Sequence, residues 1–517
     1  LHDRAAAAAL LCPMDTNSFI VPALTLLALL AFYRKVFPRG HKSTNNLPSP
    51  PSFPVIGHLH LLTSMPHHVF TNLYLRFGPL LGLRLGQVRT VIVSSAAVAK
   101  QVLKTHDHVF CDRPQLLSAQ YLSFGCSDVT FSSYGPYWRQ ARKICVSELL
   151  STRRVHSFEL IRKEEVGLLI EKVMNHAGKE IDLSRLFFQL ANDVVCRVAF
   201  GKRFEQEEGE KNSLVDVLKE TQELFAGFCL GDFFPSWEWV NWVTGYRKRL
   251  VNTTRRLSAV CDEIITNHEA KKKMESTEED EDFVDVLIGI QKRKDLEVPI
   301  TGDNLKALVL DMFVAGTDTT SATLEWTMTE LARHPEVMKR VQEEVRNVGA
   351  GKRTLQESDL HSLQFMRAAI KESMRLHPAV PLLVPRQSME KCVLEGYAIP
   401  KGSRIVINWY AIGRDPRSWK DPLVYNPDRF MEEEVDFKDQ DFRFLPFGGG
   451  RRGCPGYSFG LATIEIALAR LLYHFDWALP EGADANRLNL EEDFGLATRK
   501  RCPLVLVPSP PHGFGSF

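Results

Sequence analysis

Hydrophobic residues along the chain follow the spacing of helices much more often than the alternation of strands. The clearest example lies between Thr301, a residue type that starts helices, and His334-Pro335, where a helix should end. Its apolar residues recur on one face: Leu305, Leu308, Val309, Met312 and Phe313. A helix of this length measures about 50 Å, enough to cross a whole domain. Short β-branched runs at 88–94 and 403–408 indicate strands. The pattern predicts a mainly α fold with small β-sheets.

The N-terminal region carries an apolar, uncharged run at 19–33, followed by basic residues. Extended through Phe37, a helix here reaches about 28 Å, close to the roughly 30 Å of a bilayer core. In a cleaved signal peptide the positive charges precede the apolar run, but here they follow it. We therefore expect a retained anchor helix at 14–37 with the basic flank in the cytosol. A cleaved signal or an interfacial helix is the alternative. Residues 1–13, before Met14, are interpreted as translated upstream sequence.

The rest of the chain divides into three expected parts. Residues 38–59 form a basic and proline-rich hinge, in which the prolines of 47–57 favour stiff, extended backbone. Residues 60–508 form the catalytic domain, and 509–517 a flexible tail. A charged stretch at 271–282 should be a solvated loop.

Composition excludes several classes of function. A formal net charge of +1 over 517 residues gives no reason to expect a nucleic acid partner. The ten cysteines include no CxxC pair, so a zinc site or a dithiol redox motif is not expected. Their wide spacing instead suggests a reducing compartment.

The strongest chemical signal is the segment FGGGRRGCPG at 447–456. Consecutive glycines let the backbone approach a bulky group, and a cysteine just before a helix receives N–H groups that favour a thiolate. A cysteine in a glycine-rich loop is otherwise usually structural. The arrangement formed by Phe447, Gly450, Arg452, Cys454 and Gly456 resembles the haem-binding loop of the cytochrome P-450 superfamily. That resemblance implies the cytochrome P-450 fold around a buried haem b, with Cys454 as the iron ligand.

Other motifs extend the resemblance to nearly the whole chain. AGTDTT at 315–320, in the middle of the long helix, resembles the oxygen-activation segment, with Asp318 and Thr319 as its acid and alcohol. A threonine hydroxyl there can divert a backbone hydrogen bond and open the helix to water.

A second pair of motifs resembles a structural network of the family. Glu372 and Arg375 are three residues apart on one helix face, and Arg429 follows in NPDRF. The family usually has Glu where this chain has Asp428. We expect these residues to serve folding, not catalysis.

Cationic and aromatic residues resemble the family's partners of the haem propionates. Trp138 and Arg142 have the W-x-x-x-R spacing, Arg386 lies in LVPRQ, and Arg452 is two residues from the cysteine. A guanidinium suits a carboxylate because its fork allows paired hydrogen bonds.

The resemblance implies a monooxygenase that takes O2 as co-substrate. Electrons should come from NADPH through a separate NADPH-cytochrome reductase, with Arg139, Lys143 and Arg451 in a basic docking face. AIGRDPRSW at 411–419 and the proline-rich hinge look most like the plant A-type enzymes of the endoplasmic reticulum membrane. Two alternatives keep the haem: an isomerase or dehydratase that does not use O2, and a non-catalytic haem sensor or ligand carrier.

The resemblance also points to apolar and aromatic segments around a substrate pocket, which favours a hydrophobic small molecule. The residues expected to line it are Leu116, Phe124, Phe225, Phe313, Ala315, Val380, Leu383 and Leu496. A terpenoid is the first choice of substrate, followed by phenylpropanoids, flavonoids and alkaloids.

Overall fold

The computed structural model describes residues 47–203, 214–226, 229–237, 239–272, 281–438 and 441–511. The expected anchor at 14–37, the stretch 1–13 and most of the charged loop at 271–282 lie outside these residues. Within the described part of the chain, no helix combines the length and the apolar character needed to cross a bilayer.

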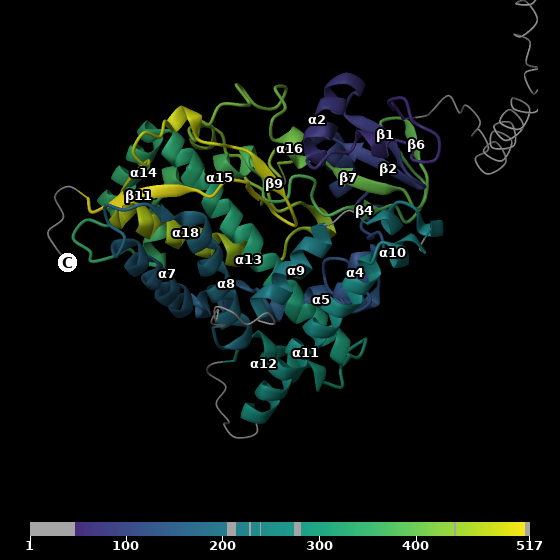
Figure 1. The fold of residues 1–517 in the computed structure, drawn as a ribbon, viewed down its shortest axis with the longest axis horizontal. Coiled ribbons are helices and arrows are strands. Elements are labelled where there is room, and N and C mark those ends of the chain that lie inside the picture. The colour runs from purple at the N-terminus through teal and green to yellow at the C-terminus, as the bar shows by residue number, and fades with distance from the viewer. Residues whose placement is uncertain are drawn as a thin grey trace, which may run out of the picture. The chain divides into compact units, whose positions relative to one another are not determined.

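Helices form most of the unit that contains residues 47–517 (Figure 1). They are α2 (Pro66–Phe77), α3 (Ala96–Lys100), α4 (Leu117–Leu122), α5 (Pro136–Ile144), α6 (Thr152–Ser157), α7 (Glu159–Met174), α8 (Leu183–Phe200), α9 (Leu214–Ala226), α10 (Val240–Val243), α11 (Tyr246–Lys272), α12 (Phe283–Gln291), α13 (Gly302–Arg333), α14 (Pro335–Val348), α15 (Gln364–Leu376), α16 (Trp409–Ile412), α17 (Arg429–Glu432) and α18 (Tyr457–His474).

The strands form small sheets, as the sequence predicts. They are β1 (Leu80–Leu85), β2 (Val88–Val93), β3 (Ile181–Asp182), β4 (Arg386–Gln387), β5 (Cys392–Leu394), β6 (Tyr397–Ile399), β7 (Arg404–Ile407), β8 (Asp476–Ala478), β9 (Glu492–Phe494), β10 (Thr498–Lys500) and β11 (Val505–Ser509). The largest described sheet has the order β1-β2-β7-β4. The two runs identified from their β-branched residues, β2 and β7, pair in parallel at its centre.

The proline-rich segment packs on this sheet. Gly82 donates a backbone hydrogen bond to Pro48, 2.9 Å away, and His58 donates one to Arg84 at 2.7 Å. Residues 47–59 therefore share the folded unit that we expected to begin at residue 60.

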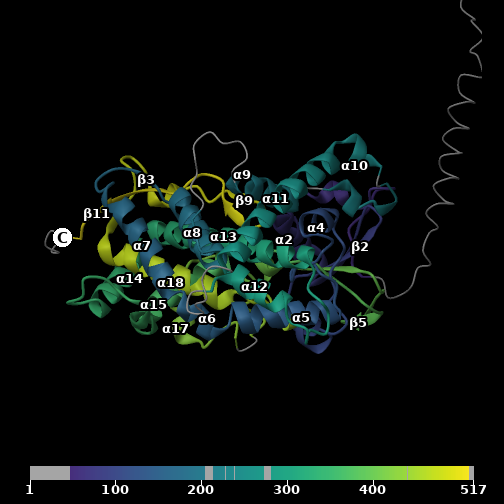
Figure 2. The same cartoon turned by 90° about the horizontal axis from the view of Figure 1, so that it is seen from below.

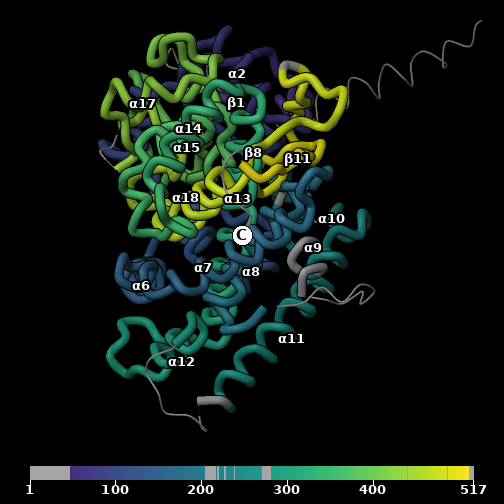
Figure 3. Tube along the Cα trace, turned by 90° about the vertical axis from the view of Figure 1, so that its left-hand side faces the viewer, coloured from purple at the N-terminus to yellow at the C-terminus, as the bar shows by residue number. Residues whose placement is uncertain are grey.

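Helix α13 runs through the interior of this unit, with α8 and α18 beside it (Figures 1 and 2). Its N-terminus is capped because the Thr301 hydroxyl accepts from Asn304 N at 3.2 Å, and its C-terminal residue precedes His334, as predicted. Figure 3 shows α11 and α12 together at the end of the unit away from α14 and α15.

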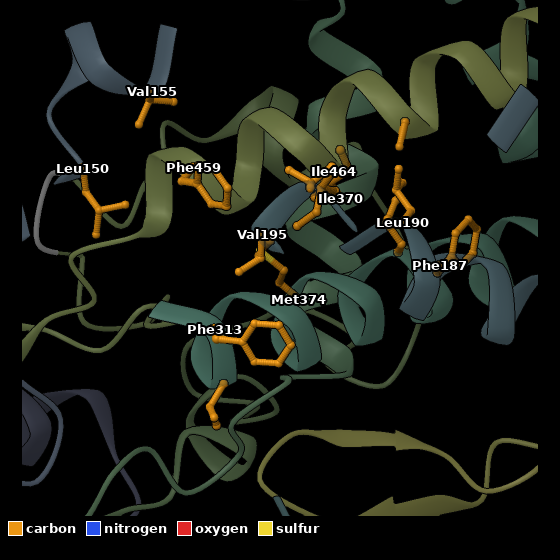
Figure 4. Packing of buried hydrophobic residues seen from close by; sticks show 14 of the residues in the cluster. Leu150, Val155, Phe187, Leu190, Val195, Phe313, Ile370, Met374, Phe459 and Ile464 are labelled. Atoms are coloured by element: carbon orange, nitrogen blue, oxygen red, sulfur yellow. The ribbon is translucent and has the colours of Figure 1, made fainter. Parts of the chain in front are cut away.

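The core around α13 brings residues from several helices together. Val195 of α8, Met374 of α15 and Ile464 of α18 converge beside the helix (Figure 4). A Cβ added at Gly316 would lie 2.9 Å from the Val195 side chain, so only glycine lets α13 and α8 approach this closely.

Candidate functional site

A cavity of about 320 Å³ lies against α13, in front of the loop that precedes α18. Apolar side chains form most of its lining, which also includes four arginines. Cys454 and Thr319 both belong to the lining, although 135 positions separate them in sequence. The fold therefore joins the two motifs that the sequence suggested for chemistry.

Cys454 is fixed by the geometry of its loop. Its backbone N–H donates to the Phe447 carbonyl at 2.9 Å, which closes the loop at its base. The accessible surface of Cys454 faces the cavity. The thiol therefore lies within the protein although the residue has exposed surface. Burial raises the pKa of the Cys454 thiol, while the N–H groups of Gly456 and Tyr457 and the charge of Arg142 act against this rise.

This arrangement fits an iron ligand. The N–H groups are placed to stabilise a sulfur anion, but burial opposes ionisation unless a cation is bound beside it. A metal ion would supply that positive charge, and a thiolate is a good ligand for iron.

The glycines of the loop serve two different purposes. Gly448 lines the cavity, whereas Gly450 has φ +64° and lies against the backbone after α3. A Cβ at Gly450 would be 2.4 Å from the Leu103 carbonyl oxygen. Gly450 is thus needed for a close contact between these two segments.

Arg452 and Arg386 line the cavity and are buried. The Arg452 guanidinium donates to the carbonyls of Cys111 at 2.7 Å and Ser132 at 2.6 Å, and lies 4.1 Å from the centre of the Trp138 ring. Arg386 donates to Asp107 at 2.8 Å. Burial lowers the pKa of Arg386, against the attraction of Asp107.

Arg113 is a cavity residue that the sequence analysis missed. It donates to the carbonyls of Thr130 at 2.8 Å and Val384 at 2.6 Å. Burial, followed by repulsion from Arg386 and Arg452, holds the pKa of Arg113 well below its ordinary value. A lone arginine before a proline carries no sequence signal for this position.

Arg142 adds a fourth cation to the lining, and no hydrogen bond or ion pair joins its guanidinium to any residue the structure describes. Four arginines thus share a largely apolar cavity, and within the residues that the structure describes only Arg386 among them forms an ion pair with a carboxylate. Such an excess of buried positive charge needs anions, and a haem carries two carboxylates. The donor set therefore fits the haem that the sequence resemblance implies.

Thr319 and Asp318 face different surroundings. The Thr319 hydroxyl donates to the Ala315 carbonyl at 2.8 Å, and Thr319 and Ala315 both line the cavity. Asp318 is buried, does not belong to the lining, and forms an ion pair with Arg499 of β10. Helix α13 is continuous through this segment, and the local opening that we expected is absent from it.

Glu372, Arg375 and Arg429 form the network that the sequence suggested. Two nitrogens of Arg375 each lie 2.7 Å from a carboxylate oxygen of Glu372, and Arg429 Nε lies 3.0 Å from it. Glu372 and Arg375 have no exposed side-chain surface. The usual Glu position of the motif holds Asp428, which pairs with Arg340 at 2.8 Å and leaves Arg429 free to reach Glu372.

Five of the residues expected in the substrate pocket line the cavity: Phe225, Ala315, Val380, Leu383 and Leu496. Leu116, Phe124 and Phe313 do not. Phe313 instead stacks against Phe200 of α8, with ring centres 6.1 Å apart. Phe124 lies beneath the Lys306 ammonium at 5.8 Å, and Leu116 packs against the small cluster of Ala119, Cys126 and Phe131. The lining also includes two residues that the sequence analysis missed, Asp128 and Asp311.

Fold and site together define a mainly helical protein in which the Cys454 thiol faces a largely apolar cavity that also holds four arginines. The Cytochrome P450 family model matches residues 47–504, so the chain belongs to the cytochrome P450 family. It is 53% identical to tryptamine 5-hydroxylase of Oryza sativa subsp. japonica, covering 96% of this chain and 97% of that protein. It is 40% identical to premnaspirodiene oxygenase of Hyoscyamus muticus, covering 95% and 98%. A zebra fish cytochrome P450 structure with progesterone has a TM-score of 0.75 and 28% identity, covering 86% of this chain and 99% of that one.

Proposed function

We propose that the protein is a haem-thiolate monooxygenase of hydrophobic plant metabolites, with electrons supplied from NADPH by a separate reductase. The observation that carries the proposal is the placement of Cys454 and Thr319 in the lining of one cavity. When bound, the haem with its thiolate ligand supplies the activation of O2. All other requirements fall on side chains of this chain.

The proposed roles of these side chains follow from their contacts. The arginines of the lining neutralise the haem carboxylates, with Trp138 packed under Arg452. The Thr319 hydroxyl is a proton-donating group at the cavity wall, where the apolar lining excludes bulk water. Asp318, paired with Arg499, provides a carboxylate behind that wall.

Two surfaces support the proposed location at the endoplasmic reticulum membrane and the proposed reductase partner. Helix α10 and its flank expose Trp239, Trp242 and Val243, with 64%, 67% and 78% of their surfaces accessible, and large exposed apolar residues are typical of membrane-contacting segments. Arg139 and Arg451 are about half exposed, at 51% and 47% for their side chains, and suit an acidic electron donor.

The names of two relatives state chemically different compounds, tryptamine for one and premnaspirodiene for the other. A terpenoid is the first choice of substrate from the sequence. The proposal therefore extends to a hydrophobic specialised metabolite. It favours oxygen insertion over the isomerase or dehydratase alternative, because Thr319 lies in the lining.

The test is the absorption spectrum of the reduced protein with carbon monoxide, followed by turnover with a plant reductase. We expect a thiolate-type spectrum and consumption of NADPH and O2 with product formation. A spectrum of nitrogen-ligated haem defeats the assignment of Cys454, and product formation without O2 favours the isomerase alternative. Ligand binding without any turnover favours a sensor or carrier.

A further inference from the structure

Two adjacent histidines of α2 and one glutamate of β9 bring their side chains together outside the cavity. His67 Nε2 lies 2.7 Å from Glu492 Oε2, and His68 Nε2 lies 2.9 Å from the same oxygen. None of these three residues belongs to the lining that holds Cys454. Their ligand atoms all lie within 4.8 Å of one another, so a single metal ion fits among them.

A structural contact between α2 and β9 explains only part of this arrangement. His67 is fully buried, and its hydrogen bond to Glu492 joins segments 425 positions apart in sequence. His67 alone makes that bond, so the contact does not require His68. Yet Nε2 of His68 is a buried atom that points into the cluster and has no hydrogen bond within the described residues. Leaving such an atom unsatisfied typically costs about 1–3 kcal/mol.

The protonation states of the cluster are those that metal ligands need. Burial lowers the pKa of His67, although its hydrogen bond to Glu492 acts in the opposite direction. Burial acts to raise the pKa of Glu492, but its contacts with His67 and His68 hold that pKa below its ordinary value. At neutral pH the cluster therefore offers a neutral imidazole and an ionised carboxylate, the forms in which these side chains bind metal ions.

Aromatic rings hold the two imidazoles in position. Phe494 of β9 stacks on His67 with ring centres 5.6 Å apart. The ring of Tyr410, in α16, lies 4.8 Å from that of His67 and 5.0 Å from that of His68. Helices α2 and α16 and strand β9 thus converge around the cluster (Figure 1). A site that is already assembled loses less conformational entropy when an ion binds.

The donor set selects the class of metal. Ca²⁺ and Mg²⁺ prefer several oxygen ligands, whereas this cluster offers one carboxylate, and the nearby cation Arg414 opposes binding by charge alone. Imidazole nitrogen suits zinc and its neighbours among the transition metals, and two histidines with one glutamate form a recognised zinc ligand set.

Zinc requires only a small rearrangement of the cluster. Zinc lies about 2.0–2.2 Å from nitrogen and oxygen ligands, so each imidazole nitrogen must move about 0.5 Å further from Oε2 of Glu492. His68 has room for this shift because 44% of its side chain is exposed. The same exposed side gives an ion a path from solvent.

One other cluster of this kind occurs in the part of the chain that the structure describes, formed by His268, Asp282 and Asp285. Its carboxylates cap α12: Asp282 accepts from Asp285 N at 2.9 Å, and Asp285 accepts from Asp282 N at 3.4 Å. The remaining oxygen of Asp282 lies 2.7 Å from His268. Helix capping accounts for that cluster, whereas it does not account for His68.

We propose that His67, His68 and Glu492 form a binding site for Zn²⁺ or a similar transition-metal ion, with water in the fourth position. The site is separate from Cys454, so the inference does not depend on the proposed function. A bound ion joins the first turn of α2 to β9, and the chain continues from β9 into Leu496 of the cavity lining. The ion thereby braces the β9–β10 hairpin that carries one residue of the cavity wall.

The experiment uses the purified haem-loaded full chain, prepared without a histidine tag and freed of loosely bound metal with a chelator. The protein is dialysed against a series of ZnCl₂ concentrations, and the zinc bound per protein chain is measured by mass spectrometry. We expect the tightest phase of binding to saturate at a single zinc ion per chain. A large excess of Mg²⁺ should not displace this ion.

His68→Gln removes one ligand but leaves the contact between His67 and Glu492 that joins α2 to β9. Loss of a ligand should weaken zinc binding at least as much as loss of an outer-shell partner does, which is about 10–100-fold. Zinc should also raise the unfolding midpoint of the unchanged protein but not that of the variant. The matched control is His176→Gln, because His176 is exposed and belongs to neither cluster. It should bind zinc as the unchanged protein does.

Two results overturn the inference. One is that the unchanged protein retains no zinc after dialysis, and the other is that His68→Gln binds zinc with the same affinity as the unchanged protein. The second result is what a purely structural role of the His67–Glu492 contact predicts. The carbon monoxide spectrum of the same samples tests the proposed function separately, since neither substitution lies in the loop of Cys454.

Discussion

Replacing Glu372 by glutamine should cost the protein a large part of its stability. The Glu372 carboxylate has no exposed surface and receives two nitrogens of Arg375, one of Arg429 and the backbone N–H of Asn426 at 2.9 Å. Glutamine keeps the size of the side chain but leaves the buried guanidinium of Arg375 and the partly buried one of Arg429 without a counter-charge. Breaking one side of a buried ion pair typically costs about 3–5 kcal/mol.

Arg429→Lys provides a graded comparison. Lysine keeps the charge but loses the fork that reaches Glu372 and the carbonyls of Lys420 and Val424, so a smaller loss of about 1.5–3 kcal/mol is expected. Asp295→Asn is the control, because Asp295 and its partner Arg293 are exposed and their ion pair should contribute nothing measurable.

The assay is denaturant unfolding of the haem-loaded protein, followed by circular dichroism and by the thiolate-type carbon monoxide spectrum. The midpoint should fall most for Glu372→Gln, less for Arg429→Lys and not at all for Asp295→Asn. Glu372→Gln with the midpoint of the unchanged protein would refute the reasoning, since it would mean that the charge of Glu372 is not needed by its arginines.

Further predictions concern the site. Cys454→Ser should abolish the thiolate-type spectrum, and retention of that spectrum would identify another ligand. Thr319→Ala should raise peroxide release per NADPH oxidised, whereas Thr317→Ala, which loses only a bond to the Phe313 carbonyl at 3.1 Å, should not. Arg499→Gln, which removes the partner of Asp318, should change the solvent isotope effect on turnover, and Arg499→Lys should keep the isotope effect of the unchanged protein. The same isotope effect in the unchanged protein and in both variants would contradict a role for the pair. Asp318→Asn should slow product formation by about 10²-fold, measured at saturating substrate and reductase.

Periodicity and caps were sufficient to predict the central helix. The residues Thr301 and His334 bound α13 within one position, because both signals are local to the backbone. The loop around Cys454 was identified from residue types at fixed spacing. In both cases the information lies within a short stretch of chain.

The pocket was harder to predict because it depends on direction around a helix. Residues advance by about 100° along α13, so Phe313 lies about 200° from Asp311 and points to the opposite side. Ala315, about 40° from Asp311, shares its face and lines the cavity. A segment-by-segment resemblance assigns the whole stretch to the pocket and cannot separate these faces.

Charged residues of the cavity were missed for a different reason. Arg113 and Asp128 are ordinary surface types in the sequence, and only tertiary packing reveals that both are at least 95% buried. The cost of burying them argues that each has a partner. Attraction to Asp128 and Asp311 acts on Arg113 in the same cavity, so the four arginines of the lining outnumber its two acids and suit the carboxylates of a haem.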